Sequence, residues 1–280
     1  MSNARNKANA RLQSLQSLLC VGLDSDLAKI PEPFASLPNP VVAFNRSIIR
    51  ATAAYAVAYK INTAFYEAYG IAGLQAMEET LAMIPDNCLS IADAKRGDIG
   101  NTSAMYAKAF FEHWNFDALT VAPYMGSDSL EPFFAYEEKL IFVLGLTSNA
   151  GSADFEEQRL QSGQPLYERV IERTRQWSRN GNGGVVVGAT KSSQLAALRT
   201  EAPDLFMLIP GVGAQGGSLE EAVTCGVDAE RQNAIINVSR ALIYPPAPRA
   251  SGFASVEEYE QTVSAIAMEL AQSMKQALQG

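Results

Sequence analysis

Eight short apolar runs recur along the 280-residue chain, and each is followed by a polar or glycine-bearing end. Their length and their β-branched residues favour buried parallel strands, because strands covered on both faces read as nearly continuous apolar runs. The runs are LLCVGLD (18–24), AVAYKI (56–61), CLSIADAK (88–95), ALTVAP (118–123), LIFVLGLT (140–147), GVVVGAT (184–190), LFMLIPG (205–211) and AIINVSR (234–240).

Helical stretches lie between these runs. Asn39 and Pro40 place a cap and a first-turn proline before one of them. At the N-terminus, Leu12, Leu15 and Leu19 recur at helical spacing, which predicts a short amphipathic helix. Eight strands that alternate with helices predict an α/β protein folded as a (β/α)8 TIM barrel. A doubly wound open sheet is the alternative, because periodicity does not distinguish a closed sheet from an open one.

The domain organisation follows from the same pattern. No low-complexity linker or internal repeat divides the chain, so residues 1–280 are expected to form one barrel domain. The short N-terminal helix precedes the first strand. The longest interval between strands, near 148–183, is predicted to be a polar loop followed by a helix around 165–179.

Composition excludes several classes of protein. A net charge of −8 argues against general nucleic-acid or anionic-membrane binding, so an anionic substrate needs a local cationic pocket. Cys20, Cys88 and Cys225 are widely spaced and odd in number, which suits a reducing compartment. No signal peptide or membrane-spanning run is apparent, and a cytoplasmic location is expected. The single histidine, His113, lies late in a predicted helix and is interpreted as structural.

Charged and polar residues gather at the carboxyl ends of the predicted strands, where barrels keep their active sites. Asp93 and Lys95 stand two residues apart in one strand and therefore share a face. Lys60 ends the neighbouring strand, and Asp98 follows on the loop. Lys60, Asp93, Lys95 and Asp98 thus form a candidate array of alternating charge, which favours a catalytic site over a brace of structural ion pairs.

A glycine-rich segment, PGVGAQGG (210–217), follows the seventh strand, and Arg240 ends the eighth. Glycine lets backbone N–H groups approach a phosphate closely, and arginine donates two hydrogen bonds to phosphate oxygens. Barrels often bind phosphate after strands seven and eight. The pair therefore predicts a phosphate site.

These residues carry a family resemblance. The string from Asp93 to Thr102, DAKRGDIGNT, resembles the DxKxxDI(x)NT signature of the orotidine 5′-monophosphate decarboxylases, and Lys60 in YKIN also resembles a family lysine. The similarity extends from VGLD at 21–24 to Arg240. One departure is NVSRAL around Arg240, where many relatives have a Gly-Arg-Ser order. The longer interval after the fifth strand resembles one subgroup.

The resemblance implies conversion of orotidine 5′-monophosphate to UMP and CO2, in pyrimidine biosynthesis, without metal or cofactor. It implies that Lys95 delivers the proton, that Asp93 faces the departing carboxylate, and that Lys60 and Asp98 hold the array. The implied substrate contacts are Asp24 to the ribose, Ser148 to the pyrimidine, Thr102 to the substrate, and Gln215 and Arg240 to the phosphate. It also implies a homodimer in which Asp98 and Thr102 serve the neighbouring subunit's site.

Residue patterns alone leave other interpretations open. Asp24 equally fits a turn cap, while Ser148 and Thr102 fit local backbone hydrogen bonding. A Mg²⁺-dependent decarboxylase or synthase acting on a sugar phosphate shares the shorter DxKxxD motif. A Schiff-base aldolase using Lys60 or Lys95 is a second rival, although flanking aspartates keep both lysines protonated. A non-catalytic phosphate-binding barrel leaves the charge array unexplained.

Overall fold

The computed structural model describes residues 3–213 and 216–280, which include a closed barrel of eight parallel strands in the order β1 to β8. The predicted (β/α)8 barrel is confirmed, and the open doubly wound sheet is wrong. The strands are β1 (Leu19–Gly22), β2 (Ala58–Asn62), β3 (Leu89–Arg96), β4 (Ala118–Val121), β5 (Leu140–Leu146), β6 (Gly183–Val187), β7 (Phe206–Pro210) and β8 (Ala234–Val238).

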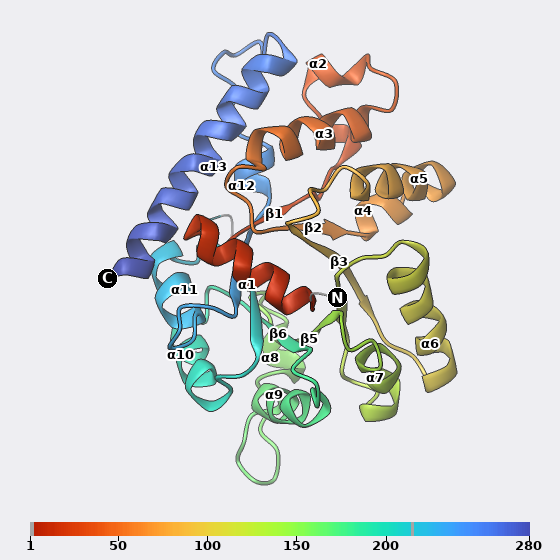
Figure 1. Cartoon of the computed structure of the whole chain (residues 1–280), viewed down its shortest axis with the longest axis vertical. Coiled ribbons are helices and arrows are strands. Elements are labelled where there is room, and N and C mark those ends of the chain that lie inside the picture. The colour runs from red at the N-terminus through yellow and green to blue at the C-terminus, as the bar shows by residue number, and fades with distance from the viewer. Residues whose placement is uncertain (1–2, 214–215) are drawn as a thin grey trace.

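Helices surround the strands in a ring (Figure 1). The shorter ones are η1 (Leu27–Lys29), α2 (Glu32–Ala35), α4 (Ala64–Glu67), the π-helical turn η2 (Ala109–His113), α8 (Ser152–Phe155) and α12 (Arg240–Ile243). The longer ones are α1 (Ala4–Leu15), α3 (Pro40–Thr52), α5 (Gly70–Leu81), α6 (Gly100–Lys108), α7 (Ser127–Phe134), α9 (Leu166–Trp177), α10 (Ser192–Glu201), α11 (Leu219–Gly226) and α13 (Val256–Gln279).

Helix starts follow the sequence signals. The Asn39 side chain accepts a hydrogen bond from the Val42 backbone N–H, ahead of Pro40, as predicted. The helix expected around 165–179 is α9, at Leu166–Trp177. The predicted N-terminal helix forms, but the inclusion of Leu19 is wrong. Gln16 adopts a left-handed conformation (φ 51°) that ends α1, and Leu19 begins β1 with its side chain buried.

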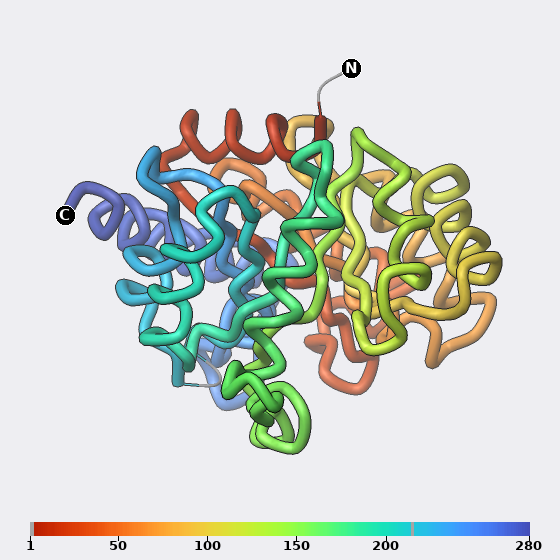
Figure 2. The backbone as a smooth tube through the Cα atoms, turned by 90° about the horizontal axis from the view of Figure 1, so that it is seen from below, coloured from red at the N-terminus to blue at the C-terminus, as the bar shows by residue number. Residues whose placement is uncertain are grey.

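The two ends of the barrel differ. α1 crosses the end at which the strands begin, and the segment that contains α8 projects at the opposite end (Figure 2). Arg5 of α1 donates hydrogen bonds to Asn233 Oδ1 and to the Gly181 carbonyl, while Lys7 pairs with Asp117 at 2.8 Å. Because these partners precede β8, β6 and β4, α1 closes the amino end of the barrel and leaves the carboxyl end for a site.

α13 packs against α3 through an aromatic cluster. Phe44 of α3 is fully buried, and its ring centroid lies 5.4 Å from that of Phe34 and 5.3 Å from that of Tyr259 on α13. Such ring pairs stabilise beyond the apolar area that they bury. Among the helices that the structure describes, none is long and apolar enough to cross a membrane.

We predict that Phe44→Ala lowers the free energy of unfolding by roughly 3–5 kcal/mol, because it leaves a cavity inside this cluster. Met268→Ala is the control, because Met268 is exposed on α13 and should change stability by about 0.5 kcal/mol or less. Urea denaturation of both variants measures the difference. Equal, small losses would contradict the importance of the cluster.

Candidate active site

The site begins with three neighbouring strands. β1 pairs with β2, and β2 pairs with β3 in a register that sets Asn62 beside Asp93. Lys60 lies near the carboxyl end of β2 and is 4% exposed. Its Nζ lies 2.9 Å from Asp93 Oδ2 on one side and 3.6 Å from Asp24 Oδ1, beyond β1, on the other. A lysine is stable at this depth because two carboxylates offset the loss of water.

The charge states follow from this geometry. Burial alone would lower the pKa of Lys60, but the neighbouring Asp24 and Asp93 outweigh it and raise that pKa above its ordinary value. Burial alone would raise the pKa of Asp93, but Lys60 and Lys95 outweigh it and hold that pKa well below its usual range. Lys60 and Asp93 are therefore both ionised at neutral pH.

The two lysines differ in access. Lys95 Nζ donates to Asp93 Oδ1 at 2.5 Å, and its side chain is 48% exposed, against 5% for that of Lys60. Lys60 lies between two carboxylates, whereas Lys95 has one acidic partner and an open side. Lys95 is accordingly the group placed to reach a bound substrate, and Lys60 is the group placed to hold the carboxylates.

Asp98 does not join this array within one chain. Its Oδ1 accepts from the Ile99 backbone N–H, and its backbone exchanges hydrogen bonds with Ser103 Oγ. The array found within the chain is Asp24–Lys60–Asp93–Lys95, with Asp24 as the second acid instead of Asp98. Asp98 does not line the cavity of its own chain, and its place in the set stays a prediction.

A cavity of about 260 Å³ opens at this array. Six of the predicted site residues line it, namely Asp24, Lys60, Asp93, Lys95, Ser148 and Arg240. Gly188 lets the end of β6 approach that of β5 closely, because a Cβ there would lie 2.8 Å from Ser148 Cβ.

Most of the predicted phosphate site lies among the residues that the structure describes. Gly211 and Val212 line the cavity with Arg240, which begins α12 and is exposed. Gly211 and Gly213 have φ values of 102° and 73°, a conformation that glycine adopts without strain. Gln215 lies outside the described residues. The loop and Arg240 thus meet at one side of the cavity mouth.

Several residues that line the cavity were not predicted from the sequence. Among them are Thr120 of β4 and Ser239, the residue before Arg240. Thr120 lies within an apolar run, so the sequence pattern predicts that it belongs to the hydrophobic core. Ser239 Oγ is buried without a hydrogen-bond partner among the described residues, and its only signal was the NVSR departure from the family order.

Other predicted candidates lie elsewhere. Thr102, on α6, does not line the cavity, and neither does His113, whose ring lies 5.6 Å from that of Trp114.

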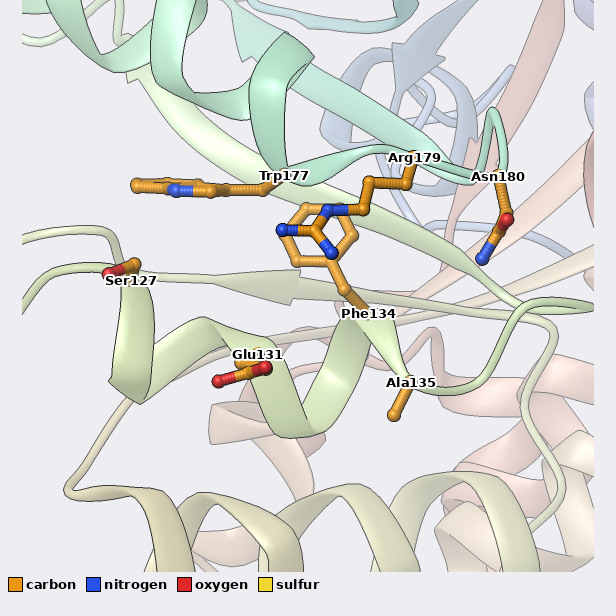
Figure 3. A pocket seen from close by; sticks show the side chains of 7 residues that line it. All are labelled: Ser127, Glu131, Phe134, Ala135, Trp177, Arg179 and Asn180. Carbon is orange, nitrogen blue, oxygen red and sulfur yellow. The ribbon is translucent and has the colours of Figure 1, made fainter.

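A larger cavity of about 430 Å³ lies between α7 and α9, where Arg179 and Trp177 face Phe134 and Glu131 (Figure 3). It contains none of the predicted site residues. No group of three His, Cys, Asp or Glu residues suited to a metal ion occurs in the described part of the chain.

The family model for "Orotidine 5'-phosphate decarboxylase / HUMPS family" matches residues 17–253, from the turn before β1 to beyond α12. The chain belongs to this family. Orotidine 5′-phosphate decarboxylase of Parabacteroides distasonis is 48% identical over 248 residues, which cover 88% of each chain. The resemblance carried by the Asp93–Thr102 string is confirmed.

Solved structures agree with the family assignment. The structure of Leishmania donovani OMP decarboxylase superposes with a TM-score of 0.82 at 38% identity, covering 99% of both chains. The structure of Leishmania donovani UMP synthase gives 0.85 at 39% identity, and there the match covers 99% of this chain but 57% of the synthase. This chain therefore corresponds to one part of that longer protein.

We predict that Lys60→Met lowers the free energy of unfolding by about 3–5 kcal/mol at pH 7.5, because it removes the buried ammonium that pairs with both Asp24 and Asp93. In the wild type the depressed pKa of Asp93 stabilises the fold above the ordinary aspartate pKa, and that contribution is lost as pH falls through the native pKa. In the variant the pKa of Asp93 rises, because only one of its two ammonium partners, Lys95, remains. Protonation of Asp93 should therefore make the loss of stability smaller at pH 4.5.

Denaturant unfolding at both pH values measures this effect. Lys29→Met is the control, because its pair with Asp26 lies at the surface, where solvent screens it, and its loss should change stability little at either pH. An equal loss at pH 4.5 and pH 7.5 would contradict the assigned charge states.

Proposed function

We propose that this protein decarboxylates orotidine 5′-monophosphate to UMP and CO2 in pyrimidine biosynthesis, and is therefore a carboxy-lyase. The observation that carries the proposal is Asp93 held between a buried Lys60 and an accessible Lys95 at the mouth of the barrel. The names of the relatives favour this activity over the sugar-phosphate alternative. The lysines paired to aspartates also disfavour Schiff-base chemistry, which needs a neutral amine.

The proposed reaction breaks the bond between C6 and the carboxylate and leaves an electron pair on C6. Lys95 stands beside C6, stabilises the developing negative charge and delivers a proton to that carbon. Asp93 faces the departing carboxylate. Two like charges about 4 Å apart repel by roughly 4 kcal/mol at an effective dielectric of 20, and this repulsion is relieved as CO2 leaves. Catalysis then depends on fixed charges and on binding energy from the rest of the nucleotide, and we propose that it needs no cofactor.

The remaining contacts orient the nucleotide. Asp24 Oδ1 is buried without a hydrogen-bond partner among the described residues, which suits an acceptor for a ribose hydroxyl. Ser148, which follows the end of β5, lines the cavity and is proposed to contact the pyrimidine. Arg240, the glycine loop and Gln215 are proposed to bind the phosphate.

An assay with purified protein tests the activity. Orotidine 5′-monophosphate should convert to UMP with one CO2 released per nucleotide, and EDTA should not change the rate. Lys95→Ala should lower turnover by at least about 100-fold, because it removes the proton donor. UMP binding should survive. Lys275→Ala, an exposed change on α13, is the control and should leave turnover unchanged.

Two results would contradict this proposal. Loss of activity in EDTA that Mg²⁺ restores would support the metal-dependent alternative. A Lys95→Ala enzyme that keeps a tenth of wild-type turnover would remove Lys95 from the chemistry.

We propose further that the protein is a cytoplasmic homodimer with shared active sites. Asp98 and Thr102 lie outside the cavity of their own chain. Ile99 and Met105, on the same segment, are 56% and 66% exposed, and Tyr124 after β4 is 85% exposed. Exposed apolar side chains close in sequence to site residues that lie outside the cavity suit an isologous interface.

Two buried free cysteines, Cys20 and Cys88, suit a reducing compartment, which supports the proposed cytoplasmic location.

Mixing two inactive variants tests the shared site. Random reassembly of Lys95→Ala and Asp98→Ala chains makes half of the dimers mixed, and each mixed dimer has one site with both changes and one with neither. Activity should return to about a quarter of wild type. If native mass spectrometry detects mixed dimers and the mixture stays inactive, Asp98 acts within its own chain.

A further inference from the structure

The strand β3 is irregular where it carries the catalytic pair. β3 and β4 pair Ala92 with Leu119, and the next printed pair is Arg96 with Val121. Three residues of β3, from Asp93 to Lys95, therefore stand opposite a single residue of β4, which is Thr120. Bulges of this kind redirect side chains and are common beside active sites.

The bulge places Lys95 in an unusual backbone conformation. Its φ is 48°, in the left-handed region that residues other than glycine rarely adopt. Such strain persists only where the surroundings hold it in place. The Lys95 backbone N–H donates to Thr120 Oγ1 at 3.0 Å, so the hydroxyl replaces a partner that the irregular ladder does not supply.

The same hydroxyl also holds the neighbouring carboxylate. Thr120 Oγ1 donates to Asp93 Oδ1 at 3.0 Å. The direction is fixed, because the Lys95 N–H only donates and an ionised Asp93 only accepts. Thr120 is 1% exposed, so bulk water does not compete for these bonds. One buried hydroxyl thus connects the backbone of Lys95 to the side chain of Asp93.

We propose that Thr120 is a positioning residue for decarboxylation, which fixes the Lys95 backbone and keeps Asp93 Oδ1 in place when the Lys95 ammonium turns from Asp93 to the substrate. The proposal rests on the roles proposed above for Lys95 and Asp93. Before that turn, Asp93 Oδ1 accepts from both Lys95 Nζ and Thr120, and Oδ2 accepts from Lys60. After it, Thr120 is the remaining donor to Oδ1.

Thr120→Val tests the proposal, because it keeps the β-branched shape and removes the hydroxyl. We expect kcat to fall by about 100-fold, the effect of a small misplacement of a catalytic group, while KM changes by less than about 3-fold. Thr120→Ser keeps the hydroxyl and should stay within about 10-fold of wild-type kcat. In Thr120→Val the acid limb of the pH profile of kcat/KM should move to higher pH, because the Asp93 carboxylate loses a hydrogen-bond donor and is protonated more readily.

Thr52→Val is the matched control. Thr52 is equally buried and bonds to Tyr59 and to the Ile48 carbonyl, away from the cavity. It should reduce thermal stability without changing kcat or the pH profile. If Thr120→Val is insoluble, Thr120→Cys, a weaker donor of similar size, should show the same fall in kcat and the same shift of the profile.

Three outcomes distinguish the possible failures. A folded Thr120→Val enzyme with wild-type kcat and an unmoved acid limb would overturn the positioning role. Equal losses of kcat in Thr120→Ser and Thr120→Val would also overturn it, because the hydroxyl would then not be the cause. Retained turnover in Lys95→Ala, measured in parallel, would instead show that the proposed catalytic roles are wrong.

Discussion

The ionised carboxylate of Asp93, held between Lys60 and Lys95, is the interaction on which the rest of the site depends. Lys60 is buried, and an ammonium at that depth is stable only with acidic partners on both sides. The β1–β2–β3 register supplies them, because it brings Asp24 and Asp93 to either side of one lysine. Lys95 then has its side chain at the open side of the cavity, where the proposed reaction needs a proton donor.

The barrel divides stability and chemistry between its two ends. At the amino end, α1 and its hydrogen bonds from Arg5 and Lys7 cover the strands. At the carboxyl end, the structure retains features that cost stability, namely the left-handed Lys95 and the buried oxygens of Asp24 and Ser239, which have no hydrogen-bond partner among the described residues. Strain and unsatisfied hydrogen-bonding groups of this kind gather at functional sites, where a substrate makes use of them.

Much of the fold was predictable from the sequence, because buried parallel strands and helix caps leave local patterns. All eight strands lie within or across the predicted runs, and α9 lies within the predicted range. The pairing of Lys60, Asp93 and Lys95 was predictable for a similar reason. Strand ends in a parallel barrel meet at one face, and residues two apart share a side.

The rest depends on features that no local pattern records. The left-handed Gln16 that ends α1 leaves no mark on the apolar spacing, so periodicity extended the helix to Leu19. The proposed role of Thr120 depends on a register shift between β3 and β4. The position of Asp98 outside the cavity of its own chain is likewise not visible in the spacing of the motif. These properties belong to tertiary geometry, which residue spacing alone does not contain.

The ionisation of Asp93 in the free protein is the property on which the proposed chemistry depends, and it can be measured. A ¹³C NMR titration of aspartate-labelled protein, with Asp93→Asn used to assign the resonance, follows this carboxyl group. We expect Asp93 to be fully ionised at pH 4, where an ordinary aspartate is about half protonated, because the two lysines lower its pKa. A midpoint at or above about 4 would contradict the charge array on which the proposed chemistry is built.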